Sequence, residues 1–316
     1  MKAIITGGAG FIGGHCVQHF VSSKDEVINV DKLTYAAKAE NTKSSPFSQI
    51  DICDTQALRS LVKEFKPDFI INFAAETHVD NSIVDCSNFI HSNVLGVSSI
   101  LNVCKDEKIR LCHISTDEVY GPASDRPFSE HDDLNPKNPY SATKASGDLL
   151  IKSFHNTYGL DYLIVRPSNN YGPNQHSEKF IPKLIDCISS GKEFPMYGVG
   201  DQEREWTYVE DTVKIIRKIL MSENTQWNSI YNLSSGISSK NIETAKLIIS
   251  TYNKANNTNH LLSDVVKFSK DRPGHDKKYW ISSEKLEKII KHSYTSLEQG
   301  IAEVVKQHEK YSRVSQ

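Results

Sequence analysis

The hydrophobic and polar positions in the first half of the chain alternate between two patterns. Short apolar runs, typical of buried strands, cover residues 2–6, 26–31, 68–73, 110–115 and 161–166. Longer amphipathic stretches, typical of helices, cover residues 12–22, 55–65, 88–106 and 140–158. Strands that alternate with helices are joined by right-handed crossovers into a parallel sheet with helices on both faces. We therefore predict an α/β fold with a doubly wound parallel sheet.

The composition of the chain changes after residue 167. Proline, glycine, asparagine and charged residues become more frequent, as in the stretches 168–173 and 197–201. We expect a first domain over residues 1–167 and a smaller, mainly substrate-binding domain over residues 168–316. An amphipathic stretch and an apolar run near residues 209–235 predict that this part of the chain returns to the first domain. The two domains are thus expected to be interleaved.

The charge and cysteine content exclude several classes of protein. The chain of 316 residues has 37 Lys and Arg against 39 Asp and Glu, so its net charge of -2 provides no field that would recruit nucleic acid or an anionic membrane. Six cysteines occur without a C-x-x-C pair, which indicates reduced thiols rather than disulfides or a metal site. The sequence shows no signal-peptide pattern and no apolar run of about 18 residues. We expect a cytoplasmic protein without a metal, a nucleic-acid partner or a membrane anchor.

A glycine-rich turn follows the first expected strand and opens the first expected helix. Its sequence is Gly7-Gly8-Ala9-Gly10-Phe11-Ile12-Gly13. Glycines in this context allow a tight turn and bring the backbone and a helix N-terminus close to a pyrophosphate. We predict a Rossmann-type dinucleotide site that includes Gly7, Gly10, Phe11, Ile12 and Gly13.

The second expected strand ends in Asp31, 18 residues after Gly13. A carboxylate at this position accepts hydrogen bonds from the adenosine ribose and repels a 2′-phosphate, which favours NAD over NADP. The neighbouring Lys32, also expected at the cofactor, weakens that preference. An incidental surface aspartate is the alternative interpretation.

Five further residues are candidates for contact with the cofactor. Asp51 and Ile52 are expected beside the adenine, and Ala74 and Ala75 follow the strand expected at 68–73. Asn93 is a polar residue among apolar neighbours in an expected helix. A structural asparagine with satisfied hydrogen bonds is the alternative interpretation of Asn93.

Tyr140 and Lys144 lie four residues apart in an expected helix, so both side chains are expected on one face. An ammonium near a phenol favours the phenolate and lowers the phenol pKa, which makes the phenol a base for alcohol oxidation. Thr116, Asp117 and Glu118 follow the strand expected at 110–115 and supply a hydroxyl and two carboxyl groups. Simple alcohol oxidation does not need this additional acid and base. The five residues therefore predict an oxidation coupled to an elimination.

Eight short motifs occur in order along nearly the whole chain. They are Thr-Gly-Gly-Ala-Gly-Phe-Ile-Gly at 6–13, Asp-Lys-Leu-Thr-Tyr at 31–35, Ala-Ala-Glu-Thr-His-Val-Asp at 74–80, Ser-Thr-Asp-Glu-Val-Tyr-Gly at 115–121, Ser-Asn-Asn-Tyr-Gly-Pro at 168–173, Glu-Lys-Phe-Ile-Pro at 178–182, Tyr-Gly-Val-Gly-Asp-Gln at 197–202 and Asp-Arg-Pro-Gly-His-Asp at 271–276. Their order and spacing resemble the extended short-chain dehydrogenase/reductase superfamily and, within it, the dTDP-glucose 4,6-dehydratases. The Asp117-Glu118 pair resembles the dehydratases rather than the C4 epimerases or decarboxylases.

The resemblance implies a role for each of the five candidate catalytic residues. Tyr140 removes the proton of the sugar 4-hydroxyl, with Lys144 and Thr116 beside the phenol oxygen, while hydride passes from C4 to NAD. Glu118 then abstracts the C5 proton, and Asp117 protonates the departing 6-hydroxyl. The hydride returns to C6, so that NAD is regenerated within one turnover.

The resemblance also implies a set of residues that bind the nucleotide sugar. They are Thr77, His78, Thr116, Asn169, Glu178, Lys179, Tyr197, Arg204, Asn232, Arg272 and His275. Within this set, Arg204, Arg272 and His275 are expected to hold the diphosphate, and Tyr197 to lie beside the base. The resemblance further implies a homodimer that pairs through the helices expected at 88–106 and 140–158.

Two other functions fit parts of the same pattern. One is a nucleotide-sugar C4 epimerase or decarboxylase of the same fold. The other is a dinucleotide-sensing regulator, which would not need Tyr140 and Lys144. The sequence leaves open whether the nucleotide is dTDP or UDP, because backbone and shape determine a pocket for a pyrimidine.

Overall fold

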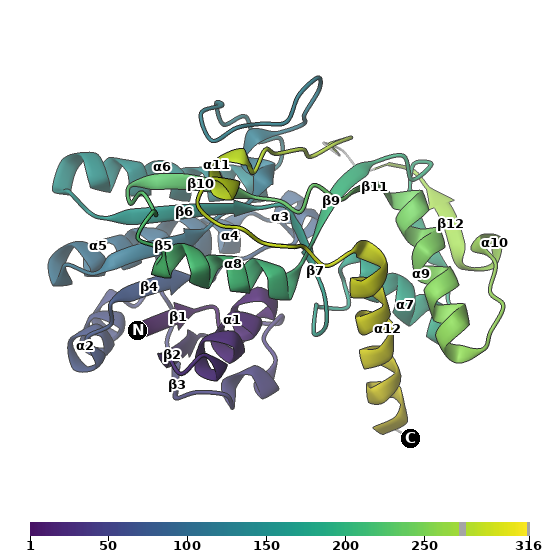
Figure 1. Cartoon of the computed structure of the whole chain (residues 1–316), viewed down its shortest axis with the longest axis horizontal. Helices are drawn as coiled ribbons and strands as arrows, with labels where there is room; N and C mark the ends of the chain where they lie inside the picture. The colour runs from purple at the N-terminus through teal and green to yellow at the C-terminus, as the bar shows by residue number, and fades with distance from the viewer. Residues whose placement is uncertain (272–275, 315–316) are drawn as a thin grey trace.

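The computed structural model describes residues 1–271 and 276–314, and side chains as far as residue 310. Its larger part is a seven-stranded sheet with the strand order β10-β6-β5-β4-β1-β2-β3 (Figure 1). The strands are β1 (Lys2–Thr6), β2 (Glu26–Asp31), β3 (Phe47–Gln49), β4 (Phe69–Asn72), β5 (Arg110–Ile114), β6 (Tyr162–Pro167) and β10 (Ser229–Leu233). Every neighbouring pair is parallel. The predicted doubly wound parallel sheet is confirmed.

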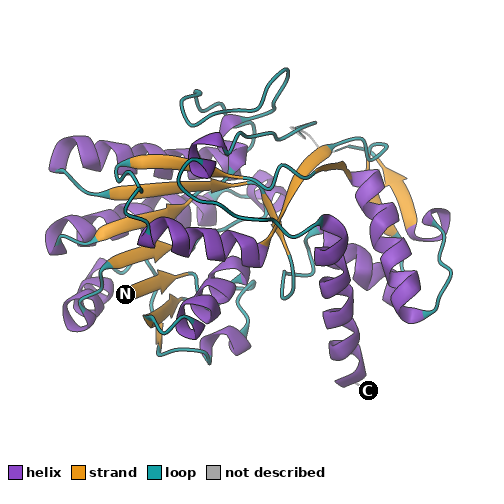
Figure 2. Ribbon diagram, viewed as in Figure 1, coloured by secondary structure: helices purple, strands orange, loops and turns teal. Residues whose placement is uncertain are grey.

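Helices cover both faces of this sheet (Figure 2). On one face lie α1 (Phe11–Ser22), α8 (Val209–Met221) and α11 (Glu284–Glu287), and on the other lie α2 (Thr55–Phe65), α5 (Val97–Glu107) and α6 (Pro139–Tyr158). Successive side chains of a strand point to opposite faces. Ile5 of β1 therefore packs in the core under α1 and α8, whereas Ile4 packs under α2 and α5. Each face has its own hydrophobic core.

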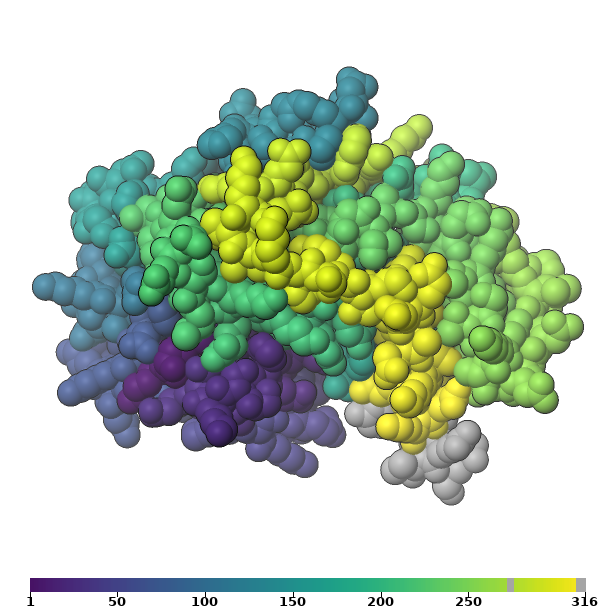
Figure 3. Space-filling view, viewed as in Figure 1, coloured from purple at the N-terminus to yellow at the C-terminus, as the bar shows by residue number. Residues whose placement is uncertain are grey.

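The second half of the chain adds a smaller lobe beside the sheet. Its strands are β7 (Asn169–Tyr171), β9 (Glu203–Tyr208) and β11 (Ser238–Lys240) in one sheet and β8 (Phe194–Tyr197) and β12 (Val266–Ser269) in another. Its helices are α7 (Phe180–Ser190), α9 (Asn241–Asn256), α10 (Leu262–Val265) and α12 (Leu297–Val314). Between β9 and β11 the chain returns to the large sheet, where α8 packs on α1 and β10 pairs with β6. After α11 the C-terminal segment crosses the surface back to the smaller lobe (Figure 3).

Two parts of the large sheet domain differ from the sequence prediction. The helix expected at 88–106 is divided into α4 (Ser87–Ile90), a π-helical turn η2 (His91–Gly96) and α5. A π turn holds an extra residue, which a search for 3.6-residue periodicity does not detect. The strand β3 was not expected because none of its three residues is buried, so it has no apolar run. Three short elements complete the domain: α3 (Val79–Val84) and the 3-10 turns η1 (Ala39–Thr42) and η3 (Asp117–Tyr120).

Among the described residues, none of the helices combines the length and the apolar character needed to cross a membrane.

A buried ion pair joins α6 to the end of β6. The Arg166 side chain is 2% exposed and that of Asp148 is 0% exposed, and Arg166 Nε donates to Asp148 Oδ2 at 2.9 Å. Arg166 also donates to the Tyr120 hydroxyl at 2.6 Å, which in turn donates to Asn232 Oδ1 at 2.9 Å. Removing one partner of such a pair leaves an uncompensated charge in the interior. The network therefore makes the relative placement of α6, β6 and η3 costly to change.

We expect Asp148→Ala to lower the free energy of unfolding by about 3–5 kcal/mol, because the Arg166 charge loses its buried partner. Urea denaturation followed by circular dichroism measures the change. Glu243→Ala is the control, since its ion pair with Lys246 is exposed and a surface substitution changes stability by no more than about 0.5 kcal/mol. Equal effects of the two substitutions would contradict a structural role of the Arg166 ion pair.

Candidate active site

A cleft runs along the carboxyl ends of the parallel strands, between the large sheet and the smaller lobe. Its cavity volume is ≈ 300 Å³. The predicted site residues that line it are Gly7, Gly10, Phe11, Ile12, Gly13, Asp31, Lys32, Ile52, Ala74, Ala75, Thr77, Thr116, Asp117, Glu118, Tyr140, Lys144, Asn169, Glu178 and Lys179. Open α/β sheets bind their ligands in the crevice at this edge. The fold thus brings residues from both halves of the chain to one ligand-sized space.

The glycines of the turn between β1 and α1 allow a close packing of backbone that side chains would prevent. Gly7 has a φ of +74°, and a Cβ on it would lie 2.5 Å from the backbone nitrogen of Ala74. A Cβ on Gly13 would collide with the carbonyl oxygen of Gly7. Gly10 precedes α1, which begins without a side-chain cap. An uncapped helix N-terminus behind a tight glycine turn fits the pyrophosphate of a dinucleotide.

Asp31 lines the cleft and is held in place by backbone groups. Its carboxylate accepts hydrogen bonds from the N–H of Leu33 at 2.8 Å and of Ala9 at 3.1 Å. Burial raises the pKa of this carboxyl, and the same N–H groups oppose the rise. The Lys32 ammonium lies 3.5 Å from the Asp51 carboxylate. Each Asp31 oxygen accepts one backbone N–H, so it retains a second lone pair that a ribose hydroxyl could use.

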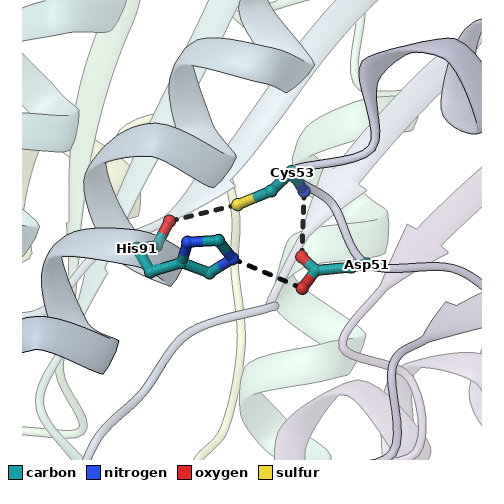
Figure 4. A group of neighbouring side chains, drawn as sticks. All are labelled: Asp51, Cys53 and His91. Atoms are coloured by element: carbon teal, nitrogen blue, oxygen red, sulfur yellow. Dashed lines mark hydrogen bonds and ion pairs between the residues drawn. The ribbon is translucent and has the colours of Figure 1, made fainter.

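Asp51 does not line the cleft, although its neighbour Ile52 does. Figure 4 shows its carboxylate accepting from the Cys53 N–H at 2.9 Å and facing His91 Nε2 at 3.5 Å. The Cys53 thiol donates to the carbonyl oxygen of His91 at 3.2 Å. Burial, followed by the charge of Asp51, raises the pKa of the Cys53 thiol to about 11, which opposes the thiolate that binds metals. Lys32 and His91 thus face the Asp51 carboxylate, and its expected contact with the cofactor stays a prediction.

Asn93 also lies behind the wall of the cleft. Its amide oxygen accepts from the Glu76 N–H at 2.9 Å, and its amide nitrogen donates to the Glu76 carbonyl oxygen at 3.0 Å. The same nitrogen donates to the Thr143 hydroxyl at 2.9 Å. These contacts favour the structural interpretation of Asn93 over the cofactor contact. They fix the segment that carries Ala74 and Ala75 against α6.

The five candidate catalytic residues meet in the cleft from two elements. Thr116, Asp117 and Glu118 follow β5, and the last two begin the turn η3. Tyr140 and Lys144 lie in the first two turns of α6. The Thr116 hydroxyl caps η3 by accepting from the Glu118 N–H at 3.3 Å. The two elements therefore face one ligand with a hydroxyl, two carboxyls, a phenol and an amine.

The structure corrects the predicted effect of Lys144 on Tyr140. The Lys144 ammonium donates to the carbonyl oxygen of Ile114 at 2.7 Å, and burial lowers the Lys144 pKa to about 8. Burial, followed by the charge of Glu118, raises the pKa of the Tyr140 phenol, and a hydrogen bond with Thr116 opposes the rise. The prediction of a lowered Tyr140 pKa is wrong for this structure, because desolvation and a neighbouring carboxylate favour the neutral phenol.

Asp117 and Glu118 lie in different surroundings, which suits them to opposite roles. Asp117 is buried, and burial followed by the charges of Glu118 and Glu205 raises the pKa of its carboxyl well above the ordinary value. Its Oδ2 has no hydrogen-bond partner within residues 1–271 and 276–314. Glu118 Oε2 accepts hydrogen bonds from Asn138 Nδ2 and the Tyr279 hydroxyl, both at 3.3 Å. The raised pKa of Asp117 favours its acid form, and Glu118 beside it is hydrogen-bonded, so the pair can supply an acid and a base.

Residues after β6 form the opposite wall of the cleft. Lys179 donates to the carbonyl oxygen of Thr77 at 3.1 Å and so joins the smaller lobe to the segment after β4. The Oδ1 atoms of Asn169 and Asn170 are buried and have no hydrogen-bond partner in the part of the chain that the structure describes. Buried acceptors are normally paired. These two atoms in the cleft wall therefore fit a ligand that carries hydroxyl groups.

Three of the expected contacts with the nucleotide sugar do not line the cleft. His78 caps α3 by accepting from the Asn81 N–H. The Tyr197 hydroxyl donates to Asp80 at 3.4 Å on the surface. The Asn232 side chain is fully buried, and its Oδ1 accepts from Tyr120 behind the site. His78 Nε2 also lies 3.7 Å from Glu178, which lines the cleft. The expected contacts of these three residues with the nucleotide sugar stay predictions.

Arg204 also lies outside the cleft wall, on the buried side of β9. Its guanidinium donates to the carbonyl oxygen of Asp276 at 2.9 Å and lies 4.4 Å from the centroid of the Tyr279 ring. The carbonyl oxygens of Asp276 and Lys277 thus hold this guanidinium, and its expected contact with a diphosphate stays a prediction. The other two members of the expected diphosphate clamp, Arg272 and His275, fall outside the described residues.

The sequence analysis did not identify several residues that the structure places at the site. Ser92, Gln175 and His176 line the cleft. Gln175 and His176 come shortly after the motif at 168–173, and that position could have marked them. Tyr279 is hydrogen-bonded to Glu118, but no feature of its local sequence indicates this contact, because a distant part of the chain provides it.

Comparison with known proteins places the chain among nucleotide-sugar enzymes. A family model described as GDP-mannose 4,6 dehydratase matches residues 4–304. The chain is similar to the low-salt glycan biosynthesis protein Agl12 of Haloferax volcanii, with 40% identity over 95% of this chain and 96% of the relative. It is also similar to a dTDP-glucose 4,6-dehydratase of Haemophilus influenzae, with 37% identity over 97% of each chain.

Solved structures show the same relationship. The structure is similar to DesIV, a dTDP-glucose 4,6-dehydratase of Streptomyces venezuelae solved with NAD and TYD bound, with a TM-score of 0.92 and 34% identity. The similarity covers 99% of this chain and 98% of DesIV. Solved UDP-sugar 4-epimerases share the fold as well.

We expect Asp31→Ser to weaken NAD binding and to reduce discrimination against NADP, because it removes a ribose acceptor and the charge that repels a 2′-phosphate. The ratio of the two dissociation constants should fall about tenfold or more, as for a lost hydrogen bond to a charged group. Calorimetric titration with both cofactors measures the ratio. Asp125→Ser, which removes an exposed carboxylate outside the cleft, is the control and should leave the ratio unchanged. A parent-like ratio in Asp31→Ser would show that this carboxylate does not bind the ribose.

Proposed function

The chain belongs to the GDP-mannose 4,6 dehydratase family, and from that premise we propose that it is an NAD-dependent nucleotide-sugar 4,6-dehydratase. Its substrate is a nucleotide-activated glucose, either dTDP-glucose or UDP-glucose, and its product is the 4-keto-6-deoxy sugar. The similar proteins of Haemophilus influenzae and Streptomyces venezuelae carry the dehydratase name. One observation of this structure carries the proposal. An acid and a base, Asp117 and Glu118, share one cleft with Tyr140.

NAD is the cofactor, and the glycine-rich turn and Asp31 are the residues proposed to hold it. The chemistry that NAD supplies is uptake of hydride from C4 and its return at C6, so the overall reaction needs no other oxidant. The cleft extends from the turn at Gly7 to Tyr140, which allows one ligand to reach from the pyrophosphate position to the phenol. The related DesIV structure holds NAD.

Oxidation of the sugar at C4 requires removal of the hydroxyl proton. Tyr140 takes this proton once its own phenol has ionised, and its hydrogen bond with Thr116 favours that ionised form. Lys144 lies on the same face of α6 and supports the charge on the phenol oxygen when its proton leaves. The resulting 4-ketone makes the neighbouring C5–H bond acidic.

Elimination of water then uses the two carboxyl groups. Glu118 takes the proton from C5, the C5–H electron pair becomes the C5=C6 double bond, and the C6–O bond breaks. Asp117, which burial keeps protonated, gives its proton to the leaving 6-hydroxyl, which departs as water. Glu118 gives a proton back to C5 when hydride returns at C6. The proton that Tyr140 gained and the one that Asp117 lost balance through exchange with the solvent.

We also propose a homodimer in the cytoplasm. Leu95 in η2 and Leu149 in α6 are exposed, at 55% and 56%, and exposed apolar side chains on neighbouring helices are suited to a contact with a second copy. The six cysteines are all free thiols, as in proteins of a reducing compartment. Size-exclusion chromatography with light scattering tests the dimer.

Turnover of dTDP-glucose and UDP-glucose by the purified protein tests the proposed function. A 4-keto-6-deoxy product, seen as a chromophore in alkali, is expected from at least one of them. Recovery of a C4 epimer, or loss of carbon dioxide from a nucleotide glucuronate, would replace the dehydratase with the epimerase or decarboxylase.

We expect Tyr140→Phe to lower the rate of C4 oxidation by about 10²–10⁴-fold, because the variant lacks the hydroxyl that takes the proton. NAD binding should persist, since the ring remains. The absorbance of reduced cofactor in a single turnover measures the oxidation. Tyr158→Phe removes an exposed hydroxyl from the same helix and serves as the control. Near-parent oxidation by Tyr140→Phe would remove this residue from the mechanism.

Asp117→Asn and Glu118→Gln should slow the formation of product more than the initial hydride transfer, because they remove the acid and the base of the elimination. Reduced cofactor should accumulate in both variants. In the parent, product formation should fall as rising pH deprotonates Asp117, and Asp117→Asn should lack this dependence. Parent-like product rates in both variants would contradict the dehydratase assignment.

A further inference from the structure

We propose that Tyr279 is a positioning residue for Glu118, the base that removes the C5 proton; this inference rests on the proposed function. The Tyr279 hydroxyl lies 3.3 Å from Glu118 Oε2 and 2.8 Å from Asp276 Oδ2. Tyr279 and Glu118 are 161 positions apart in the sequence. Tyr279 is 3% exposed and does not line the cleft. It therefore reaches the base from behind, without occupying space for the substrate.

The backbone around Tyr279 is held from two sides. The Ala123 N–H, in the segment that follows η3, donates to the carbonyl oxygen of Lys278 at 3.0 Å. The Glu203 N–H of β9 donates to the carbonyl oxygen of Lys277 at 2.7 Å. The segment after η3 continues directly from the turn that carries Glu118. The position of Tyr279 is thus tied to the turn that it contacts.

Arg204 contacts both the ring of Tyr279 and the backbone of Asp276, the other residue hydrogen-bonded to the Tyr279 hydroxyl. The guanidinium lies over the Tyr279 ring, 4.4 Å from its centroid, and donates to the backbone of Asp276 at 2.9 Å. A cation over an aromatic face restricts the ring. Burial, followed by the charge of Glu118, raises the pKa of the Tyr279 phenol. The hydroxyl therefore keeps its proton and can donate it in a hydrogen bond.

A phenol can serve both protonation states of the base. Its single hydrogen can point to Asp276 at 2.8 Å or to Glu118 at 3.3 Å. In the proposed cycle it points to Glu118 while that carboxylate is ionised. After Glu118 has taken the C5 proton, the new O–H can donate to the phenol oxygen, while the phenol O–H turns to Asp276. No bond to hydrogen breaks at Tyr279 in this exchange. Asn138 Nδ2, which contacts the same Glu118 oxygen at 3.3 Å, only donates and cannot make this change.

Tyr279→Phe tests the inference, because it removes the hydroxyl and keeps the ring under Arg204. We expect solvent-deuterium incorporation at C5 and product formation to fall roughly 10- to 100-fold, as for a lost hydrogen bond to a charged group. The first hydride transfer, the dissociation constant for NAD and the melting temperature should stay near parent values. Reduced cofactor should therefore accumulate in a single turnover. Tyr252→Phe, in the core of the smaller lobe, is the matched control and should behave as the parent.

The outcomes separate this inference from the proposed function. A parent protein that forms no 4-keto-6-deoxy product from dTDP-glucose or UDP-glucose overturns the proposed function, and the role of Tyr279 falls with it. A parent that turns over, with a Tyr279→Phe variant that exchanges C5 hydrogen at the parent rate, overturns the inference alone. Equal losses of hydride transfer and C5 exchange would assign Tyr279 a general structural role and would also overturn it.

Discussion

The buried charge of Arg166 is the constraint on which the geometry of the site depends. Water cannot reach this guanidinium to compensate its charge, so the protein has to supply the partners. Asp148, one turn beyond Lys144 on α6, supplies the counter-charge, and Tyr120, the last residue of η3, accepts a further hydrogen bond. Arg166 therefore holds α6, which carries Tyr140 and Lys144, against η3, which carries Asp117 and Glu118. A shift of either element would leave a charge unpaired in the interior.

The proposed elimination needs two adjacent carboxyl groups in opposite protonation states, and the two groups have different surroundings. Asp117 is buried in the wall of the cleft near Glu118 and Glu205, which favours its neutral form. Glu118 accepts hydrogen bonds from Asn138 at the start of α6 and from Tyr279 near the C-terminus. Because three distant segments converge here, the difference between neighbouring residues is a property of the fold as a whole.

The periodic pattern of the chain predicted most of the large sheet and the residues that form one face of the cleft. The apolar runs predicted every strand of the large sheet except β3, which has no such run because its residues are not buried. Local motifs placed the glycine turn, Asp31 and Tyr140 in the cleft, since each follows a strand or begins a helix at the same edge of the sheet. The π turn at 91–96 has no signature in a 3.6-residue pattern.

The sequence by itself determined which groups are present and which strand ends carry them, because side-chain spacing and strand order follow from local rules. Only the tertiary structure decided how those groups are charged and to which partners they turn. No local pattern indicates that Arg204 lies over the Tyr279 ring, and the Tyr140 pKa was expected to fall and instead rises. Both outcomes depend on burial and on contacts between residues far apart in the chain. Desolvation and long-range hydrogen bonds are set by packing, which no local pattern records.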